Sequence, residues 1–423
     1  MTPGRTTACC AVRVLMLVEN NCYPRDPRVR REAEALSRAG YRVSVISPAR
    51  PRQRWRETID GVHVYRFPAP PPAKGLFSYL YEYGYSMAAM FLITIWIYLH
   101  EDFDIIHVAN PPDTLVFIAA FYKVLGKLFI FDHHDLAPEM YCARFPGAGN
   151  PLVYRLLIWC EKVSCRLADL VFATNESYKA IEIGRDGIKE ECVTVLRNGP
   201  DPRTISFAQT DPSLRTRAGT IIAYAGIIGI QDGVDFLLRA LHRLIVEFGR
   251  TDVLCVVIGD GDAVPSLKHL VWELALGDFV WFAGWVDNPD SYLRYLSTAD
   301  ICVDPSPSNA YNDSSTAIKL MEYMALGKPV VAFDLPEHRF TAQSAAVYAQ
   351  PNNELKFAQA IVELMDDPAR REKMGSLGRS RVERELAWRH SVPKLLAAYR
   401  SLLSPASVQV APAANYQETD FTK

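Results

Sequence analysis

Short apolar runs alternate with helical patterns along most of the chain, and this alternation constrains the fold more than any other feature. Parallel strands joined by crossover helices produce this order. The predicted strands are 12–18, 42–46, 63–67, 105–109, 128–132, 170–173 and 194–196 in the first half, then 221–224, 254–258, 280–283, 301–303, 330–333 and 346–348 in the second. The sequence therefore predicts an α/β fold with two parallel sheets.

The length of 423 residues exceeds what one hydrophobic core usually holds. We predict two doubly wound, Rossmann-like domains that face each other across a cleft. The predicted divisions are a disordered N-terminus (1–11), a first domain (12–200), a linker (201–219), a second domain (220–385), a C-terminal helix packing on the first domain (386–403) and a disordered tail (404–423). Ligands bind outside the carboxyl ends of strands in such sheets, so the cleft is the expected active site.

Composition narrows the class of protein. The formal charge of −2 carries no nucleic-acid signature, and the cysteines show no CxxC pair, as expected for reduced thiols in the cytosol. Arginines crowd the segment 25–56, which is either a solvated face or a patch for anionic lipid.

The segment 76–99 is very hydrophobic and rich in tyrosine. Its uncharged part, 83–99, is at the short end for a membrane-spanning helix. We expect a helix that packs partly on the sheet and touches a membrane interface, with a plain core helix as the alternative.

The segment 313–332 carries the clearest chemical signal. Ser314, Ser315 and Thr316 precede Lys319 and Glu322 in an otherwise apolar helical pattern. A helix beginning near Ser315 would present free N–H groups, hydroxyls and one cation to phosphate oxygens. A carboxylate one turn deeper suits the hydroxyls of a ribose. The alternative is a capped helix with a surface Lys–Glu pair.

Several stretches agree with one family in order and spacing. They are "DPRVRREAEALSRAGYRVSVIS", "DIIHVANPPD", "FDHHDLAPE", "LADLVFATNES", "VLRNGPD", "AYAGIIGIQDGVDFLLRAL", "VVIGDGD" and "STAIKLMEYMALGKPVVAFD". Together they span about residues 12–400 and resemble the family-4 retaining glycosyltransferases with the GT-B fold. The variant "GIIGIQDGVD" with "NDSSTAIKLMEYM" resembles a branch found in bacterial surface-polysaccharide synthesis.

The resemblance implies that the second domain holds a sugar-nucleotide donor and the first holds an acceptor. It implies a ribose contact for Glu322 and places His134 beside the transferred sugar. Strand-end packing is the alternative for His134 and the favoured role for its neighbour His133. On the acceptor side we expect Asn110, Asp113, Asp135 and Glu139, and close backbone approach to the diphosphate at Gly226 and Gly229, where a tight turn is the alternative.

Three positions depart from the family pattern. Ser314 stands where the family often has a glutamate, and Ile227 and Asp232 stand where it often has an arginine and a lysine. A buried diphosphate still needs compensating charge, so we expect Lys319 and the start of its helix to supply it.

No motif indicates a metal or a cofactor. The "DFD" of 102–104 precedes a strand, so it should face away from the cleft and be structural. The sequence has no cluster with zinc-ligand spacing and no G-x-x-x-x-G-K-[ST] phosphate loop.

These observations predict a retaining, metal-independent glycosyltransferase with Lys319 and His134 as catalytic residues. It would use a UDP-sugar as donor and a lipid-linked glycan as acceptor. We expect it in the cytoplasm at the inner face of the cell membrane, with residues 25–56 and 76–99 making peripheral contact with the membrane. The alternatives are a sugar-nucleotide 2-epimerase and a catalytically degenerate scaffold of a polysaccharide assembly complex.

Overall fold

The computed structural model describes residues 11–70, 76–145, 147 and 149–403. The segments predicted to be disordered, 1–11 and 404–423, lie outside the described residues except for Ala11. The chain divides into two compact units. Unit 1 comprises Met1–Ala137, Leu156–Leu196 and Val392–Lys423, and unit 2 comprises Pro138–Arg155 and Arg197–Ser391.

Unit 1 contains an eight-stranded sheet in the order β3-β4-β2-β1-β5-β6-β7-β8. Its strands are β1 (Arg13–Leu17), β2 (Arg42–Ala49), β3 (Arg56–Ile59), β4 (Val62–Pro68), β5 (Ile105–Ala109), β6 (Leu128–His133), β7 (Leu170–Ala173) and β8 (Val193–Val195). All neighbours pair in parallel except β3 and β4, which form an antiparallel hairpin at the edge.

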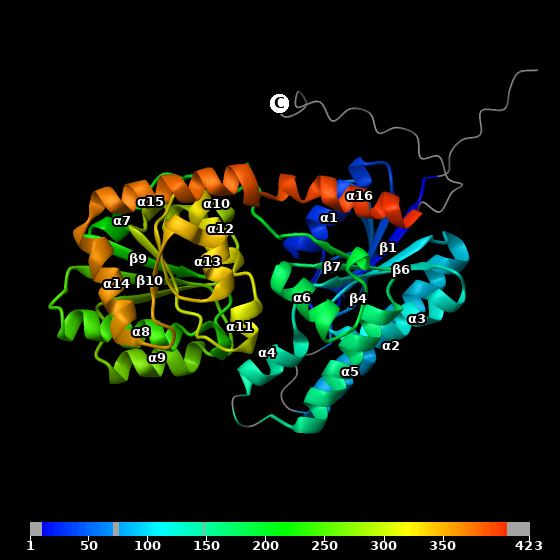
Figure 1. Cartoon of the computed structure of the whole chain (residues 1–423), viewed down its shortest axis with the longest axis horizontal. Helices are drawn as coiled ribbons and strands as arrows, with labels where there is room; N and C mark the ends of the chain where they lie inside the picture. Colours follow the sequence, from blue (N-terminus) through cyan, green and yellow to red (C-terminus); the bar gives the residue numbers. More distant parts are fainter. Residues whose placement is uncertain (1–10, 71–75, 146, 148, 404–423) are drawn as a thin grey trace, which may run out of the picture. The chain divides into compact units, whose positions relative to one another are not determined.

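Helices cover both faces of this sheet. They are α1 (Pro27–Arg38), α2 (Leu76–His100), α3 (Val116–Val124), α5 (Pro151–Leu167, of which residues 151–155 are assigned to unit 2), α6 (Glu176–Gly184) and α16 (Val392–Leu403). Alternate strand residues, such as Phe129 and Phe131 of β6, share one buried core with α2, α3 and α5. α1 and α16 pack together, apart from α2, α3 and α5 (Figure 1). The C-terminal helix α16 therefore belongs to unit 1.

Unit 2 contains a six-stranded, all-parallel sheet in the order β11-β10-β9-β12-β13-β14. Its strands are β9 (Thr220–Ala225), β10 (Val253–Ile258), β11 (Val280–Gly284), β12 (Ile301–Asp304), β13 (Val330–Phe333) and β14 (Ala346–Ala349). Its helices are α4 (Ala137–Arg144), α7 (Pro212–Arg215), α8 (Val234–Val246), α9 (Val264–Glu273), α10 (Pro289–Thr298), α11 (Ala310–Ser314), α12 (Ile318–Ala325), α13 (Pro336–Ala342), α14 (Glu354–Asp366) and α15 (Pro368–Arg381).

The sheet of unit 2 also buries both faces. One core joins its strands to α8, α9 and α14, and another joins them to α10 and α12. Figure 1 shows α8 and α9 on the side of β9 and β10 opposite to α10 and α12. The predicted fold class, two doubly wound parallel-sheet domains, is confirmed.

Each sheet has a topological switch point. In unit 2 the chain leaves β9 toward β10 on one side and later returns to β12 on the other. In unit 1, β1 lies in the same way between β2 and β5. Loops diverge at such a point and leave a crevice beside the carboxyl ends of the strands, where ligands of these folds bind.

The arginine-rich segment 25–56 does not form one exposed patch. It runs through α1, β2 and β3, and Arg28 is 2% exposed because it pairs with a buried carboxylate. Arg42 and Arg56 both pair with Glu101. The exposed part of the segment is centred on Arg50, Arg52 and Arg54.

The hydrophobic segment forms α2, as predicted, and Met90 and Ile97 lie in the core of unit 1. Among the described residues, no helix has the length and apolar character needed to cross a membrane. α2 is therefore a helix of the unit 1 fold, and parts of it remain exposed, including Leu92 and Leu99.

Candidate functional site

The segment 313–332 forms two helices instead of one. α11 ends at Ser314, Ser315 has extended backbone (φ −91°, ψ 135°), and α12 begins at Ile318. The predicted helix start near Ser315 is therefore wrong by three residues. Of the predicted set, Ser314 is the last residue of α11, Ser315 and Thr316 lie in the connection, and Lys319 and Glu322 lie on α12. The hydroxyls precede the first turn of α12, which still presents its N–H groups beside them.

Lys319 lies at the carboxyl ends of β9 and β12. Its Nζ donates to the hydroxyl of Tyr224 at 3.2 Å and lies 3.3 Å from Oδ1 of Asp232 and 3.8 Å from Oδ1 of Asp304. Burial alone lowers the pKa of this ammonium, but Asp304, Tyr224 and Asp232 together raise the pKa well above its usual value. Lys319 is therefore a permanent cation at the switch point of the unit 2 sheet.

Asp304 is the main counterion of this lysine. It is fully buried at the end of β12 and accepts from the backbone N–H and hydroxyl of Ser306. Burial raises its pKa, but the charges of Lys319 and His338 and the bonds from Ser306 hold the pKa below its usual value. Asp232 adds a second carboxylate, which is 18% exposed. A phosphate group reaching Lys319 therefore has to compete with the carboxylate of Asp232.

The loop after β9 comes very close to Lys319. A Cβ added to Gly226 would lie 3.4 Å from Cε of Lys319, and Gly226 has a φ of +150°. A Cβ on Gly259 would lie 1.8 Å from the carbonyl oxygen of Gly226, so the loops after β9 and β10 touch through their backbones. Gly229 closes the loop by donating its N–H to Asp232. The N–H of Gly226 donates to the carbonyl of Ile258 at 3.0 Å, so glycine here serves the close packing of the two loops.

Glu322 lies one turn after Lys319 on α12. Its Oε2 accepts a hydrogen bond of 2.8 Å from the hydroxyl of Tyr292 on α10. Burial and the charge of Glu322 raise the pKa of that hydroxyl well above its usual value, so Tyr292 remains a donor. Tyr292, Tyr224 and Asp304 were not predicted as site residues. The position of Asp304 directly after a predicted strand was the available signal for that residue.

Thr316 takes part in a separate contact. Its hydroxyl donates to Oε2 of Glu337 at 3.1 Å and accepts from Arg197 at 3.3 Å. Arg197 also lies 4.0 Å above the ring of Phe340. Within unit 2, Thr316 therefore ties the connection before α12 to α13.

In unit 1, Asn110 brings together three of the predicted acceptor-side residues. Its Nδ2 donates to Oδ1 of Asp113 at 2.8 Å and to the carbonyl of Asp135 at 2.7 Å. Its Oδ1 accepts from the backbone N–H groups of His134 and Asp135 at 2.6 and 3.2 Å. Asn110 and Asp113 are buried, so both hold the turn that follows β6.

His133, the last residue of β6, and His134, the residue after the strand, point to different partners. His133 is fully buried and its Nδ1 lies 2.9 Å from Oε1 of Glu182, with Glu161 beyond its other nitrogen. His134 bends back toward Asp132, with Nε2 2.5 Å from Oδ2. His133 therefore has the packing role that we favoured for it.

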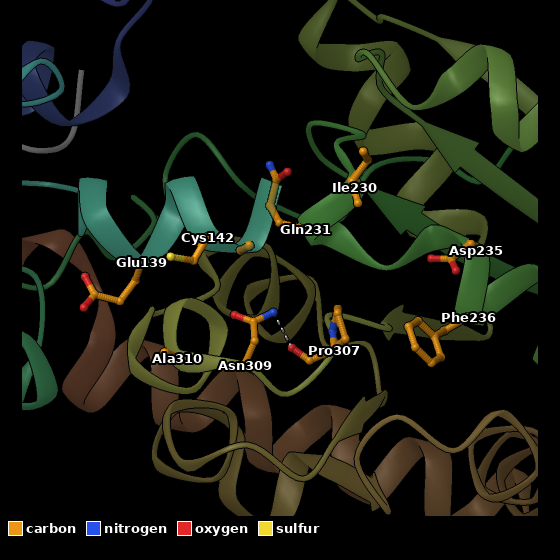
Figure 2. A pocket seen from close by; sticks show the side chains of 10 residues that line it. Glu139, Cys142, Ile230, Gln231, Asp235, Phe236, Pro307, Asn309 and Ala310 are labelled. Carbon is orange, nitrogen blue, oxygen red and sulfur yellow. Dashed lines mark hydrogen bonds between the residues drawn. The ribbon is translucent and has the colours of Figure 1, made fainter. Parts of the chain in front are cut away.

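A hollow of about 290 Å³ lies in unit 2 (Figure 2). Its lining residues are Glu139, Cys142, Ala143, Ile230, Gln231, Asp235, Phe236, Pro307, Asn309 and Ala310. Figure 2 shows the amide of Asn309 donating to the carbonyl of Pro307, at 3.2 Å. Glu139 is the one predicted site residue in this lining, and Lys319 and Glu322 do not line the hollow.

Asp102 and Asp104 of the "DFD" stretch form ion pairs with Arg13, and Asp102 also pairs with Lys127. A different group, Glu32, His107 and Asp132, has ligand atoms within 4.8 Å of one another. The guanidinium of Arg28 lies between its two carboxylates, at 2.5 Å from Asp132 and 3.3 Å from Glu32. A cation already occupies this cluster, so its geometry does not suit a metal ion.

Comparisons with known proteins agree with the motifs. Residues 26–199 match the family described as "Glycosyl transferase 4-like domain", and residues 219–367 match "Glycosyl transferases group 1". A phosphatidyl-myo-inositol mannosyltransferase from Mycolicibacterium smegmatis is 25% identical over 391 residues, which are 92% of this chain and 92% of that protein.

Solved structures share the fold. Sucrose-phosphate synthase from Thermosynechococcus elongatus superposes with a TM-score of 0.74 at 18% identity and covers 93% of this chain and 99% of its own. HepE from Anabaena, solved in complex with UDP-glucose, gives a TM-score of 0.69 at 17% identity over 92% of this chain and 99% of its own.

Proposed function

Because this chain belongs to the family-4 glycosyltransferases with the GT-B fold, we propose that it moves a sugar from a UDP-sugar to an acceptor hydroxyl with retention of configuration. The observation that carries the proposal is the convergence of Lys319, Gly226 and Glu322 at the switch point of the unit 2 sheet. HepE, which shares the fold, was solved with UDP-glucose, and this supports the choice of donor.

The proposed mechanism follows from the charge that develops on the departing phosphate. As the glycosidic bond breaks, negative charge builds on the departing phosphate oxygen. Lys319 and the N–H groups of the first turn of α12 stabilise that oxygen. Glu322 accepts hydrogen bonds from the ribose, and His134 binds a hydroxyl of the transferred sugar. The proposal includes no divalent metal: Lys319 and the helix start bind the phosphate, which displaces Asp232 from the ammonium.

The donor site is tested with purified protein and a panel of UDP- and GDP-sugars. Slow release of UDP from one donor is expected, and it should persist in EDTA. Glu322→Gln should weaken donor binding about 10- to 100-fold, since hydrogen bonds to a charged group contribute about 1.5–3 kcal/mol. Glu363→Gln, at an exposed position on α14, is the matched control and should bind the donor like the parent protein.

The alternatives give different outcomes in the same assay. An epimerase converts the sugar without needing an acceptor. A degenerate scaffold binds nucleotide without turnover, or binds none. Equal donor affinity in the parent and Glu322→Gln would show that the donor does not use α12.

We further propose a lipid-linked glycan acceptor in surface-polysaccharide synthesis, reached by peripheral contact with the cytoplasmic face of the membrane. The mycobacterial relative is named for a phosphatidyl-myo-inositol substrate. In unit 1, α2, α3 and α5 lie together (Figure 1). These helices expose large apolar side chains. These include Leu92, Phe117, Phe121 and Trp159, with Phe117 and Trp159 in ring contact at 5.9 Å. Exposed aromatic and aliphatic groups of this kind suit a lipid interface.

Vesicle sedimentation tests this surface. Leu92→Gln with Phe121→Gln should lower the partition onto vesicles containing anionic lipid by at least about tenfold, because burying each side chain contributes about 1.5–3 kcal/mol. Trp272→Gln is the control, since Trp272 is 76% exposed on α9 of unit 2. Equal partition of all three proteins would remove the membrane contact from the proposal.

A further inference from the structure

We propose that Asp132, fixed by Arg28, is a positioning residue that holds His134 as the Nε2–H tautomer and leaves Nδ1 as a hydrogen-bond acceptor for substrate. The inference rests on the proposed function, in which His134 binds a sugar hydroxyl. It adds the direction of that hydrogen bond: the sugar donates and His134 accepts.

The contact between the two side chains is short and sheltered. Nε2 of His134 lies 2.5 Å from Oδ2 of Asp132, which is fully buried, and the imidazole is 13% exposed. Arg28 donates to the same carboxylate through Nε, at 3.0 and 3.2 Å from its two oxygens, and through Nη2. Its Nη1 donates to the carbonyl of Leu196 at 2.7 Å. This second anchor keeps the guanidinium and hence the carboxylate in place.

Asp132 is an anion in this setting. Burial raises its pKa, but Arg28 and the nearby imidazoles lower the pKa well below its usual value. An ionised carboxylate only accepts hydrogen bonds, so Nε2 of His134 must carry the proton. In the neutral imidazole the lone pair then lies on Nδ1.

The other groups facing Asp132 do not change this assignment. Burial and the Asp132 charge raise the pKa of Glu32 on α1 well above its usual value, which disfavours a second negative charge beside Asp132. Burial lowers the pKa of His107 on β5. Burial also raises the pKa of Tyr399 on α16, so its hydroxyl donates to Nδ1 of His107, 2.7 Å away. Of the two carboxylates beside Arg28, Asp132 is the nearer, at 2.5 Å against 3.3 Å for Glu32.

The backbone supplies a second restraint. Asn110 accepts from the N–H of His134, so the residue is held at its main chain and at Nε2. Within the described part of the chain, the structure gives Nδ1 of His134 no hydrogen-bond partner. A fixed ring with one unpartnered acceptor nitrogen suits a hydroxyl group of a bound sugar.

The tautomer is measured directly by ¹⁵N NMR of histidine-labelled protein, which needs no turnover. The parent should show protonated Nε2 and unprotonated Nδ1 for His134, assigned by loss of the signals in His134→Gln. In Asp132→Asn the amide can donate to Nε2, so the signals should exchange places. A parent with protonated Nδ1, or an unchanged Asp132→Asn spectrum, would overturn the proposal.

Measurements of turnover distinguish a positioning role of Asp132 from a general loss of folded structure. Asp132→Asn should lower kcat about 10²-fold in the parent but have little further effect in His134→Gln, since residues acting as a unit are not additive. Equal losses in both backgrounds would mean a structural role. If the parent turns over no donor but has the expected tautomer, the proposed function fails and the positioning geometry stands.

Discussion

Replacing Lys319 by methionine is expected to lower UDP release from the donor about 10³-fold, with a smaller loss in donor affinity. Removing one donor that stabilises a developing oxyanion costs roughly 10²–10³ in kcat, and here the lost group also carries a full charge. The ammonium stays protonated because Asp304, Tyr224 and Asp232 surround it. The leaving phosphate gains negative charge in the transition state, so kcat should fall more than affinity.

The variant also leaves Asp232 and Asp304 without their cation, and breaking a buried pair commonly costs about 3–5 kcal/mol of stability. Lys319→Met with Asp232→Asn removes one of the two carboxylates and should regain part of the thermal stability. It should not regain turnover. Lys356→Met, at an exposed position on α14, controls for the substitution itself.

The measurements are single-turnover UDP release, donor calorimetry and thermal unfolding on the same preparations. A Lys319→Met protein that is folded and turns over within a factor of about three of the parent would contradict the proposed role. A double variant with restored turnover would mean that Lys319 acts only by neutralising Asp232.

Strand positions could be predicted because a buried parallel strand needs side chains that are apolar on both faces. The predicted first and last residues of β5 and β13 agree with those in the structure. β3 was missed because its residues, Arg56–Ile59, are largely polar and pair only at the edge of the sheet. The Asp60–Gly61 turn, with φ of 50° and 81°, was the local signal for that hairpin.

The helix start at Ile318 was missed for another reason. Ser and Thr side chains compete for backbone groups and favour connections as much as caps, so a cluster of them does not fix which residue begins the helix. Here Thr316 bonds Glu337 of α13, a contact across the fold that local sequence does not encode.

The residues predicted for the site belong to the sequence motifs. Several of the residues that contact them in the structure belong to other segments of the chain and were not predicted. Lys319 and Glu322 are close in sequence, but Asp304 and Tyr292 meet them only through the order of strands in the sheet. The same holds for His134, whose contact with Asp132 is local while the anchoring Arg28 lies 104 residues away from Asp132.

His133 and the carboxylates around it should make the stability of unit 1 fall as the pH rises from about 6.5 to 9. Burial lowers the pKa of His133, but Glu182 and Glu161 raise the pKa to about 9. Unfolded histidine has a pKa near 6.5, so the folded state holds an extra proton between these values, and the stabilisation is lost as the pH passes through about 9.

The titration of Glu161 also makes the stability of unit 1 fall as the pH rises. Burial raises its pKa to about 8, so the folded form also binds more protons than the unfolded chain from about pH 4.3 to 8. Each proton of difference lowers the free energy of unfolding by about 1.4 kcal/mol per pH unit. Hydrogen exchange of peptides from β6, α5 and α6 at several pH values measures this slope in unit 1 alone.

His133→Gln removes the cation from a site with several buried carboxylates, so it should destabilise unit 1 by about 3–5 kcal/mol at pH 6.5 and flatten the pH slope. His133→Gln with Glu182→Gln removes both members of the 2.9 Å pair and should recover much of the loss. His100→Gln, at the exposed end of α2, should match the parent at every pH. If His133→Gln keeps the parent's slope, His133 is neutral in the folded protein, and the carboxylates rely on Arg185, which lies 2.5 Å from Glu161.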